Sequence, residues 1–192
     1  MLAENSKATD TVAASLSRLS GAADSASAKG VYTLECRDAQ GNLKWSEVIS
    51  NLVVNQGLQD MNAKYFTGSS YTAAWYIGLY GAASSNNPAA GDTMSSHGGW
   101  TEVTDYSEAN RVTASFAAAT NANPSVVTNT ASKATFTMNG STTVGGAFLT
   151  SNNTKGGTTG TLFSAADFQA PGDRTVVSGD ILSVTYTFSL SA

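Results

Sequence analysis

The stretch Asp180-Ile-Leu-Ser-Val-Thr-Tyr-Thr-Phe-Ser-Leu190 carries the clearest periodic pattern in this sequence. From Leu182 to Leu190, an apolar residue stands at every second position, and Ser or Thr stands between each pair. Successive side chains of a β-strand point to opposite faces of a sheet. The alternation therefore predicts a long strand over residues 180–190, with one face in a core and the other face wet or paired.

The same period of two appears earlier in the chain. Residues 31–36 and 43–48 have the period of two expected of strands, and a turn at 38–42 separates them. The turn contains Ala-Gln-Gly-Asn, whose Gly and Asn favour turns, so a hairpin is expected. Further strands are expected at 74–80, 111–117, 133–138 and 142–150. In the first of these, the alternating Trp75, Ile77 and Leu79 predict a core face, which argues against a sugar-stacking role for Trp75, Tyr76 and Tyr80.

One segment of the body has helical spacing instead. Four apolar residues fall at i, i+4, i+7 and i+11, namely Val54, Leu58, Met61 and Tyr65. They predict a helix lying across the sheet, with Asn51 or Asn55 as its N-cap. Gly57 costs about 1 kcal/mol relative to Ala inside a helix, which suggests close packing on a strand.

The composition favours a β protein. Charged residues make up only 12% of the 192 residues, and Ser, Thr, Ala, Gly and Asn take their place. Strands separated by long polar loops predict a mainly β fold, an antiparallel two-sheet sandwich of the jelly-roll or Ig-like kind with one short helix packed on it. A single up-and-down barrel is the alternative. Residues 31–192 are expected to form one domain.

Residues 1–30 differ from the rest, because they are rich in Ala and Ser and contain no aromatic residue. They predict an extended N-terminal arm. Within it, Asp10 can cap a short helix that places Val12, Leu16 and Leu19 on one face as an interface. A helix this short is marginal alone, so it is expected to form against a partner, and a frayed tail is the alternative.

Charge and cysteine content exclude several classes of partner and site. The net charge is −4 with no basic run, so direct nucleic-acid binding is not expected. The single cysteine, Cys36, excludes an intrachain disulfide. The N-terminus has no signal-peptide pattern, and no segment approaches the roughly 20 apolar residues of a membrane span. We expect no membrane association and no cofactor.

Residues 92–111 concentrate chemically versatile side chains, including the only His of the chain. General acid/base catalysis would use His97 as the base. The acid, or the group that orients His97, would be a neighbouring carboxylate: Asp92, Glu102, Asp105 or Glu108. No nucleophile motif accompanies these residues. A Zn²⁺ or Mn²⁺ site would use Asp92, His97 and Glu102, yet there is no second His. We therefore expect neither an enzyme nor a metal site.

A structural role explains the same residues better. Asp92 is expected to cap a short helical turn, Trp100 to fill part of the core, and Glu102 to pair with Arg111. His97 is then a hydrogen-bonding residue of a structured loop. The glycine-rich run at 152–160 lacks the Gly-Lys-Ser/Thr ending of a phosphate loop and is expected to be a hairpin loop between Phe148 and Leu162.

Several segments in one order, from Val31 to the C-terminus, resemble a family of virion structural proteins of tailed bacteriophages. They are Asn51-Leu-Val-Val-Asn-Gln-Gly-Leu, Ala74-Trp-Tyr-Ile-Gly-Leu, Asp92-Thr-Met-Ser-Ser-His-Gly-Gly-Trp-Thr-Glu, Gly145-Gly-Ala-Phe-Leu-Thr-Ser and Gly156-Gly-Thr-Thr-Gly-Thr-Leu-Phe-Ser, closed by Gly179-Asp180 and the final strand. The arm before Val31 departs from this pattern.

The resemblance implies a non-enzymatic particle component. The expected function is that of a capsid decoration or cement protein, a class in which homotrimers are common. Such a protein is made in the bacterial cytoplasm and binds the major capsid protein on the outer surface of the virion. The alternative is a tail, baseplate or head-fibre module that binds host-surface carbohydrate. A hydrolase of host polysaccharide that depends on His97 is the third hypothesis.

Overall fold

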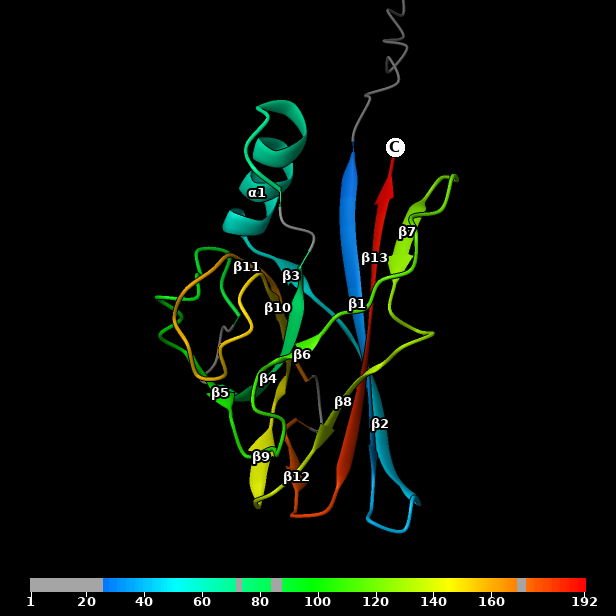
Figure 1. Cartoon of the computed structure of the whole chain (residues 1–192), viewed down its shortest axis with the longest axis vertical. Helices are drawn as coiled ribbons and strands as arrows, with labels where there is room; N and C mark the ends of the chain where they lie inside the picture. The colour runs from blue at the N-terminus through cyan, green and yellow to red at the C-terminus, as the bar shows by residue number, and fades with distance from the viewer. Residues whose placement is uncertain (1–25, 72–73, 84–87, 169–171) are drawn as a thin grey trace, which may run out of the picture.

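The computed structural model describes residues 26–71, 74–83, 88–168 and 172–192. In these residues the fold is mainly β, with two antiparallel sheets and one short helix, as the sequence predicted (Figure 1). The elements are β1 (Ser27–Arg37), β2 (Leu43–Ser50), β3 (Leu52–Val53), α1 (Asn55–Phe66), β4 (Tyr76–Ala83), β5 (Trp100–Val103), β6 (Val112–Thr113), β7 (Ser125–Thr128), β8 (Ala134–Thr137), β9 (Thr142–Val144), β10 (Gly146–Thr150), β11 (Leu162–Asp167), β12 (Arg174–Val176) and β13 (Ile181–Ser191).

The first sheet is built around the strand with the clearest alternation. Its order is β2-β1-β13-β7, and β8 also pairs with β13. The antiparallel ladder between β1 and β13 runs from Ser27↔Ser191 to Arg37↔Ile181. Leu182, Val184 and Tyr186 are buried, as the alternation predicted, whereas Leu190 at the far end is exposed. The predicted β1–β2 hairpin also forms, and Asp38 Oδ1 accepts the N–H groups of Gln40 and Asn42 in its turn.

The second sheet has the order β3-β11-β10-β4-β5, with β6 paired to β4, and β9 and β12 form a separate small sheet. The β10–β11 pair is antiparallel, so the glycine-rich run between these strands is a hairpin loop, as predicted. The 142–150 segment is not one strand. It divides at Gly145 into β9 and β10, which belong to different sheets. The Gly145 N–H donates to the Tyr80 carbonyl, and the Gly145 carbonyl accepts the Phe168 N–H.

The hydrophobic core lies between the two main sheets. β1 and β13 of the first sheet and β4, β10 and β11 of the second contribute to one cluster that includes Tyr32, Leu34, Ile77, Leu79, Ala147, Leu149, Phe163, Leu182, Val184 and Tyr186. The described strands thus form a sandwich of separate sheets, and the barrel alternative is wrong. Cys36 is buried in this core.

A buried polar network joins the sheets inside this core. The hydroxyl of Ser164 on β11 lies 2.8 Å from the Tyr32 hydroxyl and donates to the Tyr186 hydroxyl at 3.3 Å. The two tyrosine rings pack with centroids 4.5 Å apart. Asn51, where the chain passes from β2 to β3, donates its side-chain N–H to the Tyr186 hydroxyl at 3.0 Å. The network fixes the sheets at the point where the chain changes between them.

The predicted helix forms, but its cap and its packed face differ from expectation. Val54 occupies the N-cap position without a side-chain hydrogen bond, so neither Asn51 nor Asn55 caps the helix. Leu58 and Tyr65 are 42% and 84% exposed, so only Val54 and Met61 of the expected apolar stripe pack against the core. Instead Gly57 is buried against β11, where a Cβ would lie 2.3 Å from the Phe163 carbonyl oxygen. The helix sits at one end of the second sheet, beside β11, and does not lie across it (Figure 1).

Several strands lay outside the prediction. The expected strand at 111–117 is reduced to β6, and β3, β5, β7 and β12 were not predicted. β11 was implied only as the second strand of the hairpin that ends at Leu162. β1 begins at Ser27, within the segment assigned to the arm. The rest of the arm, with the predicted interface residues Val12, Leu16 and Leu19, lies outside the described residues.

Candidate functional site

Trp100 holds together the first half of the 92–111 stretch. Its indole N–H donates to Asp92 Oδ2 at 2.9 Å, and its ring stacks on Tyr80 with centroids 4.5 Å apart. The same Asp92 oxygen accepts the Ala89 N–H at 3.0 Å. Trp100 is only 4% exposed and packs in a second core cluster with Phe148, as the structural interpretation predicted. Asp92 does not cap a helical turn, because the chain forms no helix here.

His97 covers the outer side of Trp100. The two rings are stacked with centroids 4.0 Å apart and an interplanar angle of 24°. His97 Nδ1 lies 3.0 Å from the Trp100 carbonyl oxygen, so this nitrogen is the protonated one and donates the hydrogen bond. The half-buried imidazole therefore completes a stack with Trp100 and Tyr80, which is a structural role.

Glu102 and Arg111 form the predicted pair, and it is buried. Arg111 Nε donates to Glu102 Oε1 at 2.9 Å, and Arg111 Nη2 donates to Glu102 Oε2 at 2.7 Å. The two side chains are 0% and 8% exposed. Glu102 lies within strand β5, so this part of the stretch is sheet and not the loop that was expected. The bidentate geometry makes the pair a fixed joint between β5 and the start of β6.

The glycine-rich β10–β11 loop closes around this pair. Arg111 donates to the carbonyl oxygens of Asn152 and Gly157, while the Gly156 N–H donates to Glu102. The ammonium of Lys155 donates to two further backbone carbonyls, and it lies 4.3 Å from the centre of the Tyr106 ring. The loop, the ion pair and β5 are thus one cross-linked unit, in which Lys155 is engaged by the protein itself.

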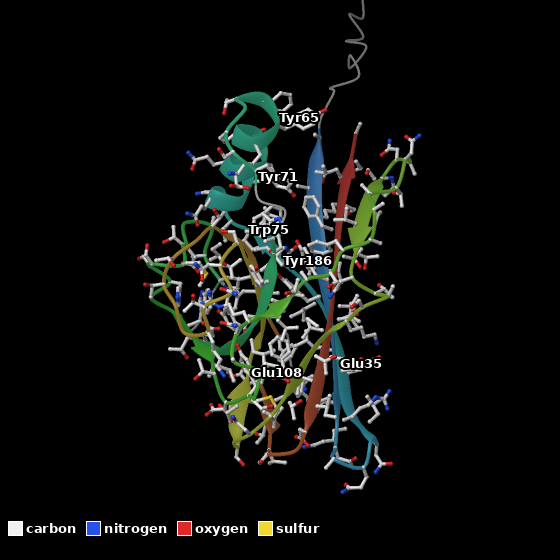
Figure 2. The ribbon with its side chains drawn as sticks, in the orientation of Figure 1. Glu35, Tyr65, Tyr71, Trp75, Glu108 and Tyr186 are labelled. Carbon is white, nitrogen blue, oxygen red and sulfur yellow. The ribbon has the colours of Figure 1, made fainter. Side chains whose placement is uncertain are left out.

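The acids near His97 have separate structural partners. Asp92 accepts from Trp100, Glu102 pairs with Arg111, and Glu108 accepts the Thr137 N–H at 3.1 Å. Across the described ranges, no group of three or more His, Cys, Asp and Glu side chains is placed to hold a metal ion. Glu108 also lies far from the helix end of the molecule, which Tyr65 and Tyr71 mark in Figure 2.

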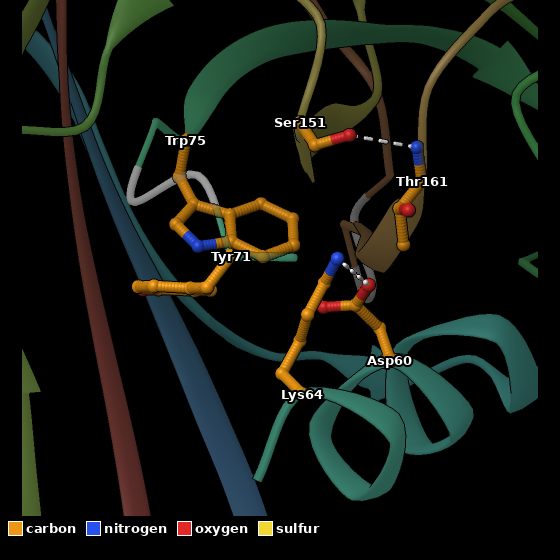
Figure 3. Close-up of a pocket in the computed structure, with 6 residues that line it drawn as sticks. All are labelled: Asp60, Lys64, Tyr71, Trp75, Ser151 and Thr161. Carbon is orange, nitrogen blue, oxygen red and sulfur yellow. Dashed lines mark hydrogen bonds and ion pairs between the residues drawn. The ribbon is translucent and has the colours of Figure 1, made fainter. Parts of the chain in front are cut away.

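A hollow of about 220 Å³ lies beside α1 and is lined by Asp60, Lys64, Tyr71, Trp75, Ser151 and Thr161 (Figure 3). Trp75 was assigned to the core face. It packs edge-on against Phe163 at 5.4 Å but is only partly buried, since it also lines this hollow. The other five residues were missed, because they come from α1, the segment after it and both ends of the β10–β11 loop. A helical i, i+4 Asp60–Lys64 pair was the one local signal.

Exposed apolar side chains occur on α1 and near the C-terminal end of β13. Tyr65 and Phe66, at the C-terminal end of α1, are 84% and 77% exposed and contact each other with ring centroids 5.0 Å apart. Leu58 on the same helix is also exposed, and so is Leu190 near the end of β13. Ser27, where the chain enters β1, lies at this end too (Figure 1). We call Leu58, Tyr65, Phe66 and Leu190 the apolar end.

Burial shifts the pKa of several groups. Desolvation, reinforced by the charge of Asp173, raises the pKa of the Asp167 carboxyl to about 6. Desolvation also raises the pKa of the Cys36 thiol to about 11, so this thiol is protonated and unreactive at neutral pH. The hydroxyls of Tyr32 and Tyr186 have pKa values raised by the same cause, which keeps both neutral in the network that joins the sheets.

Comparison with known proteins adds no relative: no protein-family model, curated protein or solved structure matches this chain. In the described part of the chain, no helix is both long and apolar enough to cross a membrane.

Proposed function

We propose that this protein is a non-enzymatic structural component of a tailed-bacteriophage virion, and specifically a capsid decoration or cement protein. In this role it binds the major capsid protein on the outer surface of the head and stabilises the shell. Self-association as a homotrimer is part of the proposal.

The observation that carries the proposal is the apolar end. Tyr65 and Phe66 of α1 are strongly exposed and contact each other, and α1 and the end of β13 both lie at the end of the molecule where the chain enters β1 (Figure 1). Exposed apolar patches typically mark protein interaction sites. β1 begins at this same end, at Ser27, and the proposal assigns the arm and the apolar end to one partner.

The character of the 92–111 stretch supports a structural role. Its His, Trp and charged side chains form a stack and a buried ion pair, which cross-link β5 to the β10–β11 loop. A decoration protein gains from rigidity, because a preorganised surface loses little conformational entropy when it docks. The resemblance of several sequence segments, in one order, to a family of tailed-phage virion proteins is the second line of support.

Repetition makes modest contacts sufficient. A capsid presents many identical sites, and copies that touch both the shell and one another gain avidity through effective concentration. Aromatic side chains are the residues that most often dominate such interfaces. Tyr65 and Phe66 are therefore the proposed anchors for the major capsid protein.

The test is co-sedimentation of the purified protein with empty heads of the phage that encodes it, prepared without this protein. We expect the Tyr65→Ser/Phe66→Ser variant to lose most binding. The matched control is Leu43→Ser/Val48→Ser, which removes two exposed apolar side chains from β2 and is expected to bind normally.

A second arm of the experiment removes residues 1–25. This deletion leaves β1 intact, because the strand begins at Ser27. Loss of binding would assign docking to the arm, and retention would assign it to the apolar end alone. Absence of binding by the unmodified protein would overturn the proposal and favour the alternative, a tail, baseplate or head-fibre module.

A further inference from the structure

The hollow beside α1 has one aromatic wall. Trp75 is supported from behind by its edge-on contact with Phe163, and its backbone carbonyl accepts the Ala114 N–H at 2.8 Å. Tyr71 stands next to it and is 63% exposed. Figure 3 shows both rings on the same side of the hollow. A supported indole beside an exposed phenol ring offers aromatic surface to a small ligand.

The opposite wall is polar and close to neutral. The Asp60 carboxylate and the Lys64 ammonium lie 3.9 Å apart on successive turns of α1. Lys64 also donates to the Ser70 carbonyl, which ties the segment after the helix to the helix itself. Ser151 accepts the Thr161 N–H at 2.8 Å and holds the two ends of the β10–β11 loop together. The wall thus offers a carboxylate acceptor, an ammonium donor and two hydroxyl-bearing side chains, with the two charges balanced.

A second hollow continues the first along the helix. It measures about 170 Å³ and is lined by Gln56, Gln59, Asp60, Ala63 and Thr161. Asp60 and Thr161 line both hollows, so the two are neighbours, and we call the two hollows together the groove. Gln56 accepts the Leu162 N–H at 2.8 Å, which fixes its amide at the wall. Side-chain amides both donate and accept hydrogen bonds, as ligand hydroxyls require.

The chemistry of the groove selects among ligand classes. A phosphate or another anion would compete with Asp60 for Lys64. A purely apolar ligand would leave the polar groups of Asp60, Lys64, Gln56 and Gln59 without hydration. A pyranose ring has an apolar C–H face and a rim of hydroxyls, which match the aromatic wall and the polar wall. The first hollow is smaller than the pockets that hold drug-sized ligands, about 300–1,000 Å³, which suits a single ring.

We propose that this groove binds a neutral oligosaccharide. One sugar residue stacks on Trp75 and Tyr71 and bonds through its hydroxyls to Asp60 and Lys64, and the next residue lies along Gln56 and Gln59. This inference goes beyond the proposed role on the capsid and does not depend on it, because the groove residues are distinct from the apolar end.

The test is a glycan array that carries neutral and acidic oligosaccharides, followed by calorimetric titration of the best-bound neutral di- or trisaccharide. Binding of a neutral glycan by the full-length protein is expected. Asp60→Asn and Tyr71→Ala should each weaken it about tenfold or more, since each removes one wall contact. Trp75→Ala should abolish it, but Trp75 also packs on Phe163, so the first two variants decide the matter if this one unfolds.

Phe66→Ala is the control, because it removes an exposed aromatic ring outside the groove. Its glycan affinity should equal that of the unmodified protein. Binding of acidic glycans only, no binding at all, or neutral binding that is unchanged in both Asp60→Asn and Tyr71→Ala would each overturn the assignment. Failure of this test leaves the capsid co-sedimentation result untouched, so the two proposals stand or fall separately.

Discussion

The guanidinium of Arg111 and the carboxylate of Glu102 form two parallel hydrogen bonds, of 2.9 and 2.7 Å, in a site closed to solvent. The remaining donors of Arg111 bond to carbonyl oxygens of the β10–β11 loop, and the loop returns a backbone N–H to Glu102. The pair therefore joins three parts of the second sheet at once.

Replacing Arg111 by Met should destabilise the protein by about 3–5 kcal/mol, because it leaves a buried carboxylate uncompensated. Urea unfolding followed by tryptophan fluorescence measures the change. Arg37→Met is the matched control, since Arg37 is exposed and bonds only to a turn carbonyl, and its effect should stay within about 0.5 kcal/mol. Equal stability of Arg111→Met and the unmodified protein would show that the pair is not a structural joint.

Gly57→Ala should destabilise the fold although Ala favours a helix by about 1 kcal/mol over Gly. The added Cβ would lie 2.3 Å from the Phe163 carbonyl oxygen, so α1 must move away from β11. Thermal unfolding of this variant should be compared with that of Asn62→Ala, an exposed position of the same helix where the propensity gain acts alone. A stabilised Gly57→Ala protein would contradict the close contact.

Asp167 should make the protein less stable as the pH rises. Burial raises its folded-state pKa from the ordinary 3.8 to about 6, so folding favours the protonated form. The stability that the protonated Asp167 contributes to the folded state is fully present below about pH 4, and it is lost as the pH rises through about 6. Asp167→Asn should remove this slope in urea midpoints measured between about pH 4 and pH 7. An identical slope in the variant would assign the dependence to another group.

Tyr186→Phe should cost about 1–3 kcal/mol, because it leaves the buried donors of Asn51 and Ser164 without their shared acceptor. Tyr71→Phe provides the control, since its ring is largely exposed. Chemical unfolding measures both variants. If they prove equally stable, the polar network does not hold the sheets together.

Alternation is easiest to detect in the strands that keep one less buried face. β13 alternates because Ser and Thr face away from the core, and the β1–β2 hairpin shows the same period. β11, by contrast, is buried at five consecutive positions, Leu162 to Ala166, and such a strand has no alternation to detect. β5 was missed for another reason. A glutamate such as Glu102 is expected at the surface, and its burial depends on Arg111 and the β10–β11 loop, which enclose it.

The helix and the groove illustrate the same limit. The spacing of Leu58 and Tyr65 indicated a helix correctly, but the packed face is set by Gly57, which meets a strand more than 100 positions further along the chain. Of the groove residues, only Trp75 was singled out. The remaining ones are brought together by the β10–β11 hairpin and the position of α1 beside it, which no local pattern encodes.

Copy number per purified virion, measured by quantitative mass spectrometry against the major capsid protein, tests the proposed function most directly. A decoration protein that occupies repeated sites of a symmetric shell should be present in on the order of hundreds of copies, in a fixed ratio to the capsid subunit. A count of a few to a few dozen copies, as expected of a tail or fibre component, or absence from the particle, would contradict it.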